Sequence, residues 1–202
     1  MITIVNYGMG NLGSVLNMFK RLGVEAKISN NIKEIEKAEK LLLPGVGAFD
    51  AAMELVNSSG LLPVLNYKAT EEKIPILGIC LGMQLLTNSS DEGILSGLKW
   101  IDADTKKFEF ADNNMKVPHM GWNFIQPKNV NSLIDGLNEK SKFYFVHSYY
   151  VQCKNDGNVL ATSLYGNNFH SIINHQNIYG AQFHPEKSHK YGMQLLTNFS
   201  KI

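Results

Sequence analysis

The chain has 202 residues, enough for one domain with a substantial core, and 44% of them are hydrophobic against 18% charged. With 19 basic and 18 acidic residues the formal net charge is +1, which favours neither nucleic acid nor an anionic membrane as the main partner. Two cysteines are too few for a disulfide framework, and the N-terminus does not resemble a signal peptide, so we expect a cytoplasmic protein.

The first half alternates short apolar runs with helical patterns. The apolar runs predict strands over 2–5, 24–28, 41–43 and 76–79, the third of them ended by Pro44-Gly45. The helical spacing of apolar residues predicts helices over 12–22 and 49–56, with another beginning at 83–86. This alternation indicates an α/β fold with a mixed, mostly parallel central sheet flanked by helices.

The second half changes character and predicts an antiparallel addition to the sheet. Strands are expected over 117–118, 143–151, 159–162, 169–173 and 178–183, several of them separated by Asn/Gly turn signals, and a last helix over 190–199. The heptapeptide GMQLLTN occurs at 82–88 and again at 192–198 between unrelated flanks, so we interpret it as two similar helix starts. No linker composition interrupts the chain, so we expect a single domain over 1–202.

The segment ILGICLGMQ at 76–84 has the glycine-x-nucleophile-x-glycine pattern of a strand-to-helix elbow centred on Cys80. Glycines two residues either side of Cys80 remove side chains that would clash in so sharp a turn. The turn would place the thiol at a helix N-terminus, where the partial positive charge favours a thiolate. The alternative, a small buried hydrophobic cysteine, is typical of free cysteines but does not explain the paired glycines.

A cysteine nucleophile needs a base and a group that orients the base. The segment QFHPE at 182–186 offers both, because His184 and Glu186 would point the same way from an extended segment stiffened by Pro185. A third motif, PGVGAF at 44–49, follows a predicted strand directly. The backbone N–H of Leu81 and a second N–H from this loop, around Val46 and Gly47, could together hold an oxyanion. Alone, this loop would be an ordinary strand-to-helix turn.

These motifs together make the chain resemble the class I (triad) glutamine amidotransferases. It is most similar to the HisH family, the glutaminase subunits of imidazole glycerol phosphate synthase. The matching segments are NYGMGNLGSV at 6–15, LPGVGAF at 43–49, GICLGMQLL at 78–86, KVPHMGWN at 116–123, YFVHSYY at 144–150 and QFHPEKS at 182–188. Met83 and the PHMGWN segment favour this family over the glutaminases of anthranilate or aminodeoxychorismate synthesis. The resemblance implies a flavodoxin-like fold and no cofactor.

Residue by residue, the resemblance implies a catalytic triad of Cys80, His184 and Glu186, with Val46 and Leu81 at the oxyanion. The positions that match residues holding the amino-acid end of glutamine are Gly47, Gln84, Glu92, His147, Ser148 and Tyr149. Two segments depart from the family pattern. The surroundings of Glu92 (TNSSDEG) lack the usual charged run, and 105–108 (TKKF) stand where the family has an arginine-containing stretch.

The resemblance also implies a heterodimer with a HisF-like (β/α)₈-barrel cyclase subunit. Glutamine would be hydrolysed to glutamate and ammonia, and the ammonia would be channelled to the cyclase, which makes imidazole glycerol phosphate and an aminoimidazole carboxamide ribotide in histidine biosynthesis. A glutaminase of this kind is nearly idle until the cyclase binds its nucleotide substrate. We therefore expect the Val46 loop to present its N–H only when docking fixes it.

Three other functions compete with this interpretation. A paralogous glutaminase could feed ammonia to another synthase, such as one that aminates or amidinates a surface sugar. A stand-alone cysteine hydrolase of the same fold could act on γ-glutamyl bonds. A catalytically silent binding subunit is the third, but it would not need Cys80, His184 and Glu186 together.

Several weaker signals are set aside. Gly8 to Gly13 form a G-x-G-x-x-G pattern after a strand, but the second strand ends without the acidic residue of a dinucleotide site. The histidine spacings fit no zinc motif. His119 is a candidate second base, although its place in PHMGWN favours a partner-facing or loop-fixing role. Cys153 has no elbow around it and is expected to be inert.

Overall fold

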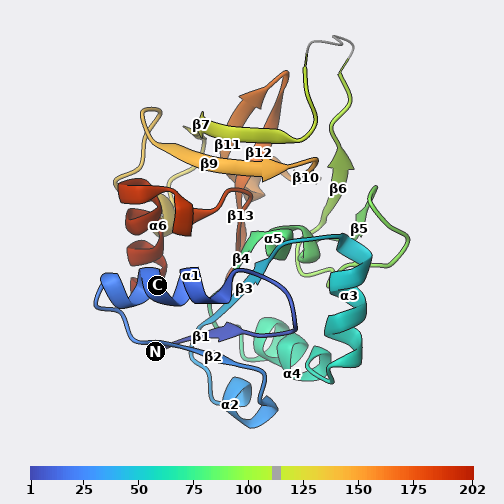
Figure 1. Ribbon diagram of the computed structural model, residues 1–202, viewed down its shortest axis with the longest axis vertical. Coiled ribbons are helices and arrows are strands. Elements are labelled where there is room, and N and C mark those ends of the chain that lie inside the picture. The colour runs from blue at the N-terminus through green and yellow to red at the C-terminus, as the bar shows by residue number, and fades with distance from the viewer. Residues whose placement is uncertain (111–114) are drawn as a thin grey trace.

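The computed structural model describes residues 1–110 and 115–202 (Figure 1). The strands are β1 (Ile2–Val5), β2 (Ala26–Ser29), β3 (Leu41–Gly45), β4 (Ile76–Cys80), β5 (Ser89–Ser90), β6 (Ala103–Lys107), β7 (His119–Phe124), β8 (Gln126–Pro127), β9 (Lys142–His147), β10 (Tyr149–Cys153), β11 (Val159–Tyr165), β12 (Asn167–His175) and β13 (Ile178–Ala181). The α-helices are α1 (Leu12–Arg21), α2 (Ile32–Glu36), α3 (Phe49–Ser58), α4 (Leu62–Asn66), α5 (Leu81–Leu85) and α6 (His189–Lys201). A π-helical turn (Tyr67–Glu71) follows α4, and 3-10 turns occur at Ser132–Ile134, Asp156–Asn158 and Pro185–Lys187.

Eleven strands form one large sheet in the order β2-β1-β3-β4-β13-β12-β10-β6-β5, with β11 beside β12 and β8 beside β11. The strands from β2 to β13 in this order run parallel. Beyond β13 the pairs are antiparallel, except for β5 with β6. The predicted α/β fold, parallel in its first half and antiparallel in its second, is confirmed.

Hydrophobic cores fill both faces of this sheet. Figure 1 shows α1 and α6 on one side and α3, α4 and α5 on the other. Phe19 of α1 and Phe199 of α6 belong to one buried cluster, and Phe49 of α3 and Leu65 of α4 belong to the other. Neighbouring residues of β4 point to opposite clusters, Ile76 to the second and Leu77 to the first. This is why parallel strands such as β4 are apolar at nearly every position rather than at alternate ones.

A separate two-stranded sheet, β7 with β9, packs against the antiparallel part of the fold (Figure 1). The run predicted as one strand over 143–151 is in fact two, because the chain leaves this small sheet at Ser148 and enters the large one. The Ser148 carbonyl accepts from the Phe108 N–H, at 3.1 Å. The predicted strand over 117–118 is wrong. Pro118 has no N–H for a ladder, and the strand begins at His119 instead.

The end of β3 also differs from the prediction, which placed it before Pro44-Gly45. The strand continues through both residues, with Pro44 opposite Ile79 and Gly45 opposite Cys80 in the parallel register. Sequence reasoning missed α2, α4, β5, β6 and β8 altogether. Among the described residues no helix is long and apolar enough to cross a membrane.

The carboxyl ends of β3, β4 and β13 lie side by side in the parallel part of the sheet. The chain leaves these strands at Val46, at Cys80 and at Gln182. Open α/β sheets commonly bind their ligands at this edge. The fold therefore brings the glycine-rich loop, the elbow and the QFHPE segment to one place.

Candidate active site

Cys80 occupies a sharp turn between β4 and α5. Its backbone has φ of +55° and ψ of −112°, an unfavourable conformation for a residue with a side chain. A Cβ on Gly78 would lie 2.5 Å from the Gly82 carbonyl oxygen, and one on Gly82 would overlap the backbone of Leu43. The two glycines therefore permit the turn, as predicted, and the thiol is carried out of the sheet.

His184 and Glu186 contact each other directly. Nδ1 of His184 lies 2.8 Å from Oε1 of Glu186, and both side chains are almost fully buried, at 3% and 2% exposed. The expectation that they would align on an extended segment is wrong. His184 precedes the 3-10 turn Pro185–Lys187, and this turn brings the carboxylate back to the imidazole. Pro185 fits the first position of such a turn because it needs no hydrogen-bonded N–H there.

The surroundings of His184 favour its charged form. Burial by itself would lower the pKa of His184, but the adjacent Cys80 sulfur and the Glu186 carboxylate outweigh it and raise the pKa to about 10. The second ring nitrogen, Nε2, is buried and makes no hydrogen bond to any residue that the structure describes. It is therefore available to exchange a proton with Cys80.

The glycine-rich loop begins next to the elbow, since Gly45 pairs with Cys80 and places Val46 beside Leu81. A side chain at position 45 would collide with Leu81 and with the Tyr7 hydroxyl. That hydroxyl donates to the Pro44 carbonyl at 2.8 Å and anchors the end of β3. Val46 is 44% exposed, and Gly47 has φ of +111°, a conformation that glycine adopts without strain.

A cavity of about 330 Å³ lies over the elbow. All the predicted site residues except Glu186 line it, namely Val46, Gly47, Cys80, Leu81, Gln84, Glu92, His147, Ser148, Tyr149 and His184. Glu186 contacts the site through His184. Pro118 and Val146 also line the cavity and were missed, although both lie within the quoted motifs. The volume suits a ligand the size of a free amino acid.

Glu92 reaches the cavity from a loop that the first turn of α3 holds in place. One of its carboxylate oxygens accepts from the Phe49 N–H at 2.9 Å, at the N-terminus of α3. The Asp50 carboxylate accepts from the N–H groups of Ile94 and Leu95, at 2.9 and 3.1 Å. These contacts fix the loop on both sides of Glu92. A negative charge is therefore held at one wall of the cavity.

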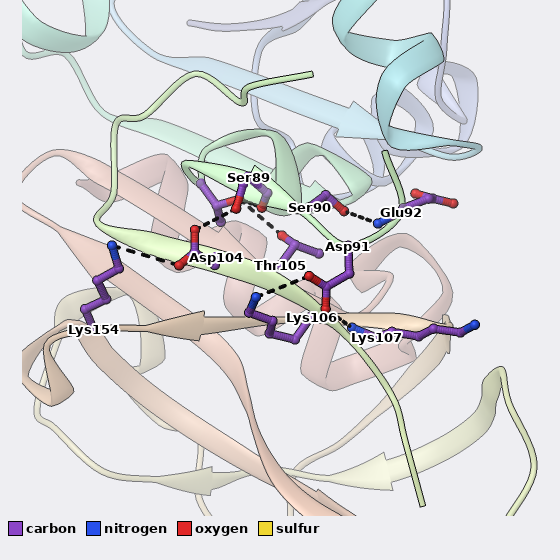
Figure 2. A network of polar contacts seen from close by, with 10 residues as sticks. Ser89, Ser90, Asp91, Glu92, Asp104, Thr105, Lys106, Lys107 and Lys154 are labelled. Carbon is purple, nitrogen blue, oxygen red and sulfur yellow. Dashed lines mark hydrogen bonds and ion pairs between the residues drawn. The ribbon is translucent and has the colours of Figure 1, made fainter. Parts of the chain in front are cut away.

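The two segments that depart from the family pattern are in contact with each other. Figure 2 shows this polar network, which joins β5 and the loop after it to β6. Asp91 accepts from Lys106 Nζ at 3.2 Å and from the Lys107 N–H at 3.1 Å, and Ser89 Oγ donates to Asp104 at 2.7 Å. The two segments thus form one polar network, and the Glu92 N–H, which donates to Ser90 Oγ at 3.1 Å, lies at its end.

His147 is a wall of the cavity whose two ring nitrogens are already engaged. Its Nδ1 lies 2.7 Å from the Tyr149 carbonyl, and its Nε2 lies 3.0 Å from Nδ1 of His119. A carbonyl only accepts, so His147 carries its proton on Nδ1 and accepts from His119 on Nε2. Burial lowers the pKa of His147 to about 3 and that of His119 to about 4, so both rings are neutral.

His119 therefore has a buried, supporting position at the start of β7. It is 3% exposed and does not line the cavity, so it is not positioned as a second base. Its ring stacks on Phe145 and on Tyr165, with centroids 4.9 and 4.1 Å apart. Of the two roles that its motif suggested, the structure favours loop fixing over contact with a partner.

Comparisons with known proteins point to one family. The family model of class-I glutamine amidotransferases matches residues 3–202. The imidazole glycerol phosphate synthase subunit HisH 2 of Methanococcus maripaludis is 55% identical, over 100% of this chain and 99% of the relative. The subunit of the same name from Pseudomonas aeruginosa is 50% identical over the whole of both chains. PurLQS from Thermotoga maritima superposes with a TM-score of 0.72, at 16% identity, over 99% of this chain and 97% of that chain.

Proposed function

Because this chain belongs to the class I glutamine amidotransferases and, within them, to the HisH subunits of imidazole glycerol phosphate synthase, we propose that it hydrolyses glutamine at Cys80 for a cyclase partner. It is the glutaminase subunit of that synthase and acts in histidine biosynthesis. We further propose that residues 1–202 form one glutaminase domain and that this domain works in the cytoplasm. The observation that carries the assignment of the site is a cysteine on an elbow, beside a buried His184–Glu186 pair, in an amino-acid-sized cavity.

In the proposed reaction, the Cys80 thiolate attacks the side-chain amide carbon of glutamine while His184 is protonated. The oxyanion that forms lies against the N–H groups of Val46 and Leu81. The His184 imidazolium then gives its proton to the departing ammonia, which leaves a thioester on Cys80. His184 next takes a proton from water, and the hydroxide formed hydrolyses the thioester to glutamate. Glu186 holds the imidazole in the tautomer that this sequence needs.

The rest of the cavity would orient the amino-acid end of glutamine. Glu92 supplies the negative charge that suits the substrate's ammonium group, and one of its oxygens is fixed by the Phe49 N–H. Gly47, Gln84, Ser148 and Tyr149 line the same cavity. His147 would contact the substrate only as part of the cavity wall, because its two ring nitrogens are occupied by Tyr149 and His119.

The partner would dock on β7, which starts one residue after Pro118 at the rim of the cavity. Alternate residues of this strand expose large apolar side chains, with Met120 at 62%, Trp122 at 44% and Phe124 at 53%. A row of this kind on one face of a small sheet is typical of a protein interface. The exposed Val46 loop lies on the same cavity and would be ordered by the same partner.

We expect a HisF-like cyclase subunit, supplied with its nucleotide ligand, to raise glutamine hydrolysis at least about tenfold above that of the isolated chain. The reason is that an oxyanion donor that is misplaced by about 1 Å can cost roughly 10²-fold in rate, and docking would fix Val46. Glutamate release, followed by a coupled dehydrogenase assay with and without the cyclase, measures the effect.

Two surface variants sharpen this experiment. Trp122→Glu places a charge in the proposed interface and should abolish activation while leaving the basal rate unchanged. Val130→Glu, on a fully exposed apolar residue outside β7, is the matched control and should be activated normally. Full activity of the isolated chain would refute partner control and favour a stand-alone hydrolase.

We expect Glu186→Gln to reduce kcat by about 10²-fold or more, because the imidazole loses the group that orients and charges it. The pH profile should change as well. In the wild type His184 stays protonated up to its raised pKa of about 10, so activity falls only as the pH rises through that region. Without the carboxylate the pKa of His184 falls, and the alkaline decline must begin at lower pH. If Glu186→Gln lost activity at the same alkaline pH as the wild type, Glu186 would have no part in setting the protonation of His184.

A second candidate function is the same glutamine hydrolysis, with the ammonia supplied to another synthase. It is favoured by the network in Figure 2, because both departures from the family pattern lie in this one surface strip. A cyclase that leaves Cys80-dependent hydrolysis unchanged would support this candidate.

A further inference from the structure

Gln182 is a fully buried polar residue to which the proposed mechanism gives no part. It is 0% exposed and lies two residues before His184. It directly follows β13, where the last pair in register with β4 joins Ala181 to Ile79. One step further along these parallel strands places Gln182 beside Cys80. Its backbone N–H donates to the Ser171 carbonyl at 2.9 Å, which anchors the residue in the sheet.

The side chain of Gln182 bridges the nucleophile and the cavity wall. Its Nε2 lies 3.9 Å from Cys80 Sγ, within hydrogen-bond range for sulfur, and its Oε1 lies 3.3 Å from Nε2 of Gln84. Gln84 Nε2 also donates to the Tyr149 carbonyl at 3.1 Å.

These contacts determine which end of each amide faces which partner. The Tyr149 carbonyl can only accept, so Gln84 must turn its NH₂ group toward it. The same NH₂ group can then meet only the oxygen of Gln182. The NH₂ group of Gln182 is left facing the sulfur, so Gln182 is a donor to Cys80 and not an acceptor.

We propose that Gln182 is a positioning residue that donates a hydrogen bond to the Cys80 thiolate and ties the nucleophile to the Gln84 wall of the cavity. An N–H donor to an anionic acceptor makes a stronger bond than one to a neutral thiol, so the contact favours the thiolate. It also restrains the sulfur relative to the wall that orients the substrate. This inference rests on the proposed function for its meaning, but its first test does not depend on turnover.

The first test is the alkylation of Cys80 by iodoacetamide as a function of pH, with peptide mass spectrometry separating Cys80 from Cys153. Gln182→Met keeps the length of the side chain and removes the donor, so the pH midpoint should rise by about one unit or more. Gln182→Glu adds a charge that repels the thiolate and should raise the midpoint further. Asn198→Leu removes another buried amide, bonded to Leu133 and Asp135, and should leave the midpoint unchanged.

The second test is glutamine hydrolysis by the same variants with the cyclase present. Gln182→Met should lose about tenfold in kcat/KM at pH 7 and recover toward the wild-type value at pH 9, where the thiolate forms without help. A purely structural defect would not be rescued by pH. Wild-type midpoints in both Gln182 variants would overturn the inference. An inactive wild type would instead refute the proposed function, and the alkylation result would still decide the role of Gln182.

Discussion

Replacing Cys80 with alanine is expected to abolish glutamine hydrolysis, with a loss of at least about 10⁴-fold in kcat. The thioester is the intermediate that divides amide hydrolysis into two easier steps, and alanine cannot form it. The remaining groups of the site would still bind glutamine, because the residues that line the cavity are otherwise unchanged. Glutamate release in the complete complex measures the loss, and calorimetry with glutamine shows whether binding survives.

Cys153 provides the matched control for this experiment. It is a buried cysteine of β10 whose backbone N–H donates to Nδ1 of His170 at 3.0 Å. Burial, followed by the nearby Asp156 and Asp102 carboxylates, raises the pKa of its thiol to about 12, so it stays protonated at neutral pH. Cys153→Ala should therefore retain wild-type activity. Substantial hydrolysis by Cys80→Ala would end the triad assignment.

The sequence was most informative where the chemistry depends on neighbouring residues. The elbow could be predicted because Gly78, Cys80 and Gly82 lie within five residues and the turn needs them in that order. The His184–Glu186 contact was also predicted, but through the wrong local conformation. A turn and an extended segment can both bring residues i and i+2 together, and the letters H-P-E do not distinguish them.

Contacts that depend on strand pairing could not be predicted in the same way. The chain over 143–151 has one continuous strand pattern, yet Ser148 divides it between two sheets. Nothing local marks that division, since it depends on where β7 and β6 lie. Gln182 was missed for a similar reason. Its partners, Cys80 and Gln84, reach it only through the pairing of β13 with β4.

Glu92 is the reverse case, because its surroundings differ from the expected family pattern and yet its side chain lines the cavity as predicted. The TNSSDEG segment lacks the charged run that the resemblance led us to expect, but the Glu92 carboxylate reaches the cavity and accepts from the Phe49 N–H. Asp91 and Lys106, one from each departing segment, pair with each other.

Gly82→Ala should be the most destabilising single-atom addition in the site, at about 3 kcal/mol or more, or roughly 6–12 °C in Tm for a chain of this size. The new methyl group would overlap the backbone carbonyl of Leu43, and backbone on a central strand cannot move aside as a side chain can. Relief would require α5 to move away from β3, which would displace Cys80 from the Val46 loop. Thermal unfolding and glutamate release should therefore fall together.

Gly13→Ala is the control for this substitution, because Gly13 lies in α1 with nothing within 4 Å of the added Cβ. Alanine also favours the helix, so this variant should be neutral or stabilised by up to about 1 kcal/mol. If Gly82→Ala unfolded at the wild-type temperature, the close approach of α5 to β3 would be wrong. The elbow would then owe its shape to something other than its glycines.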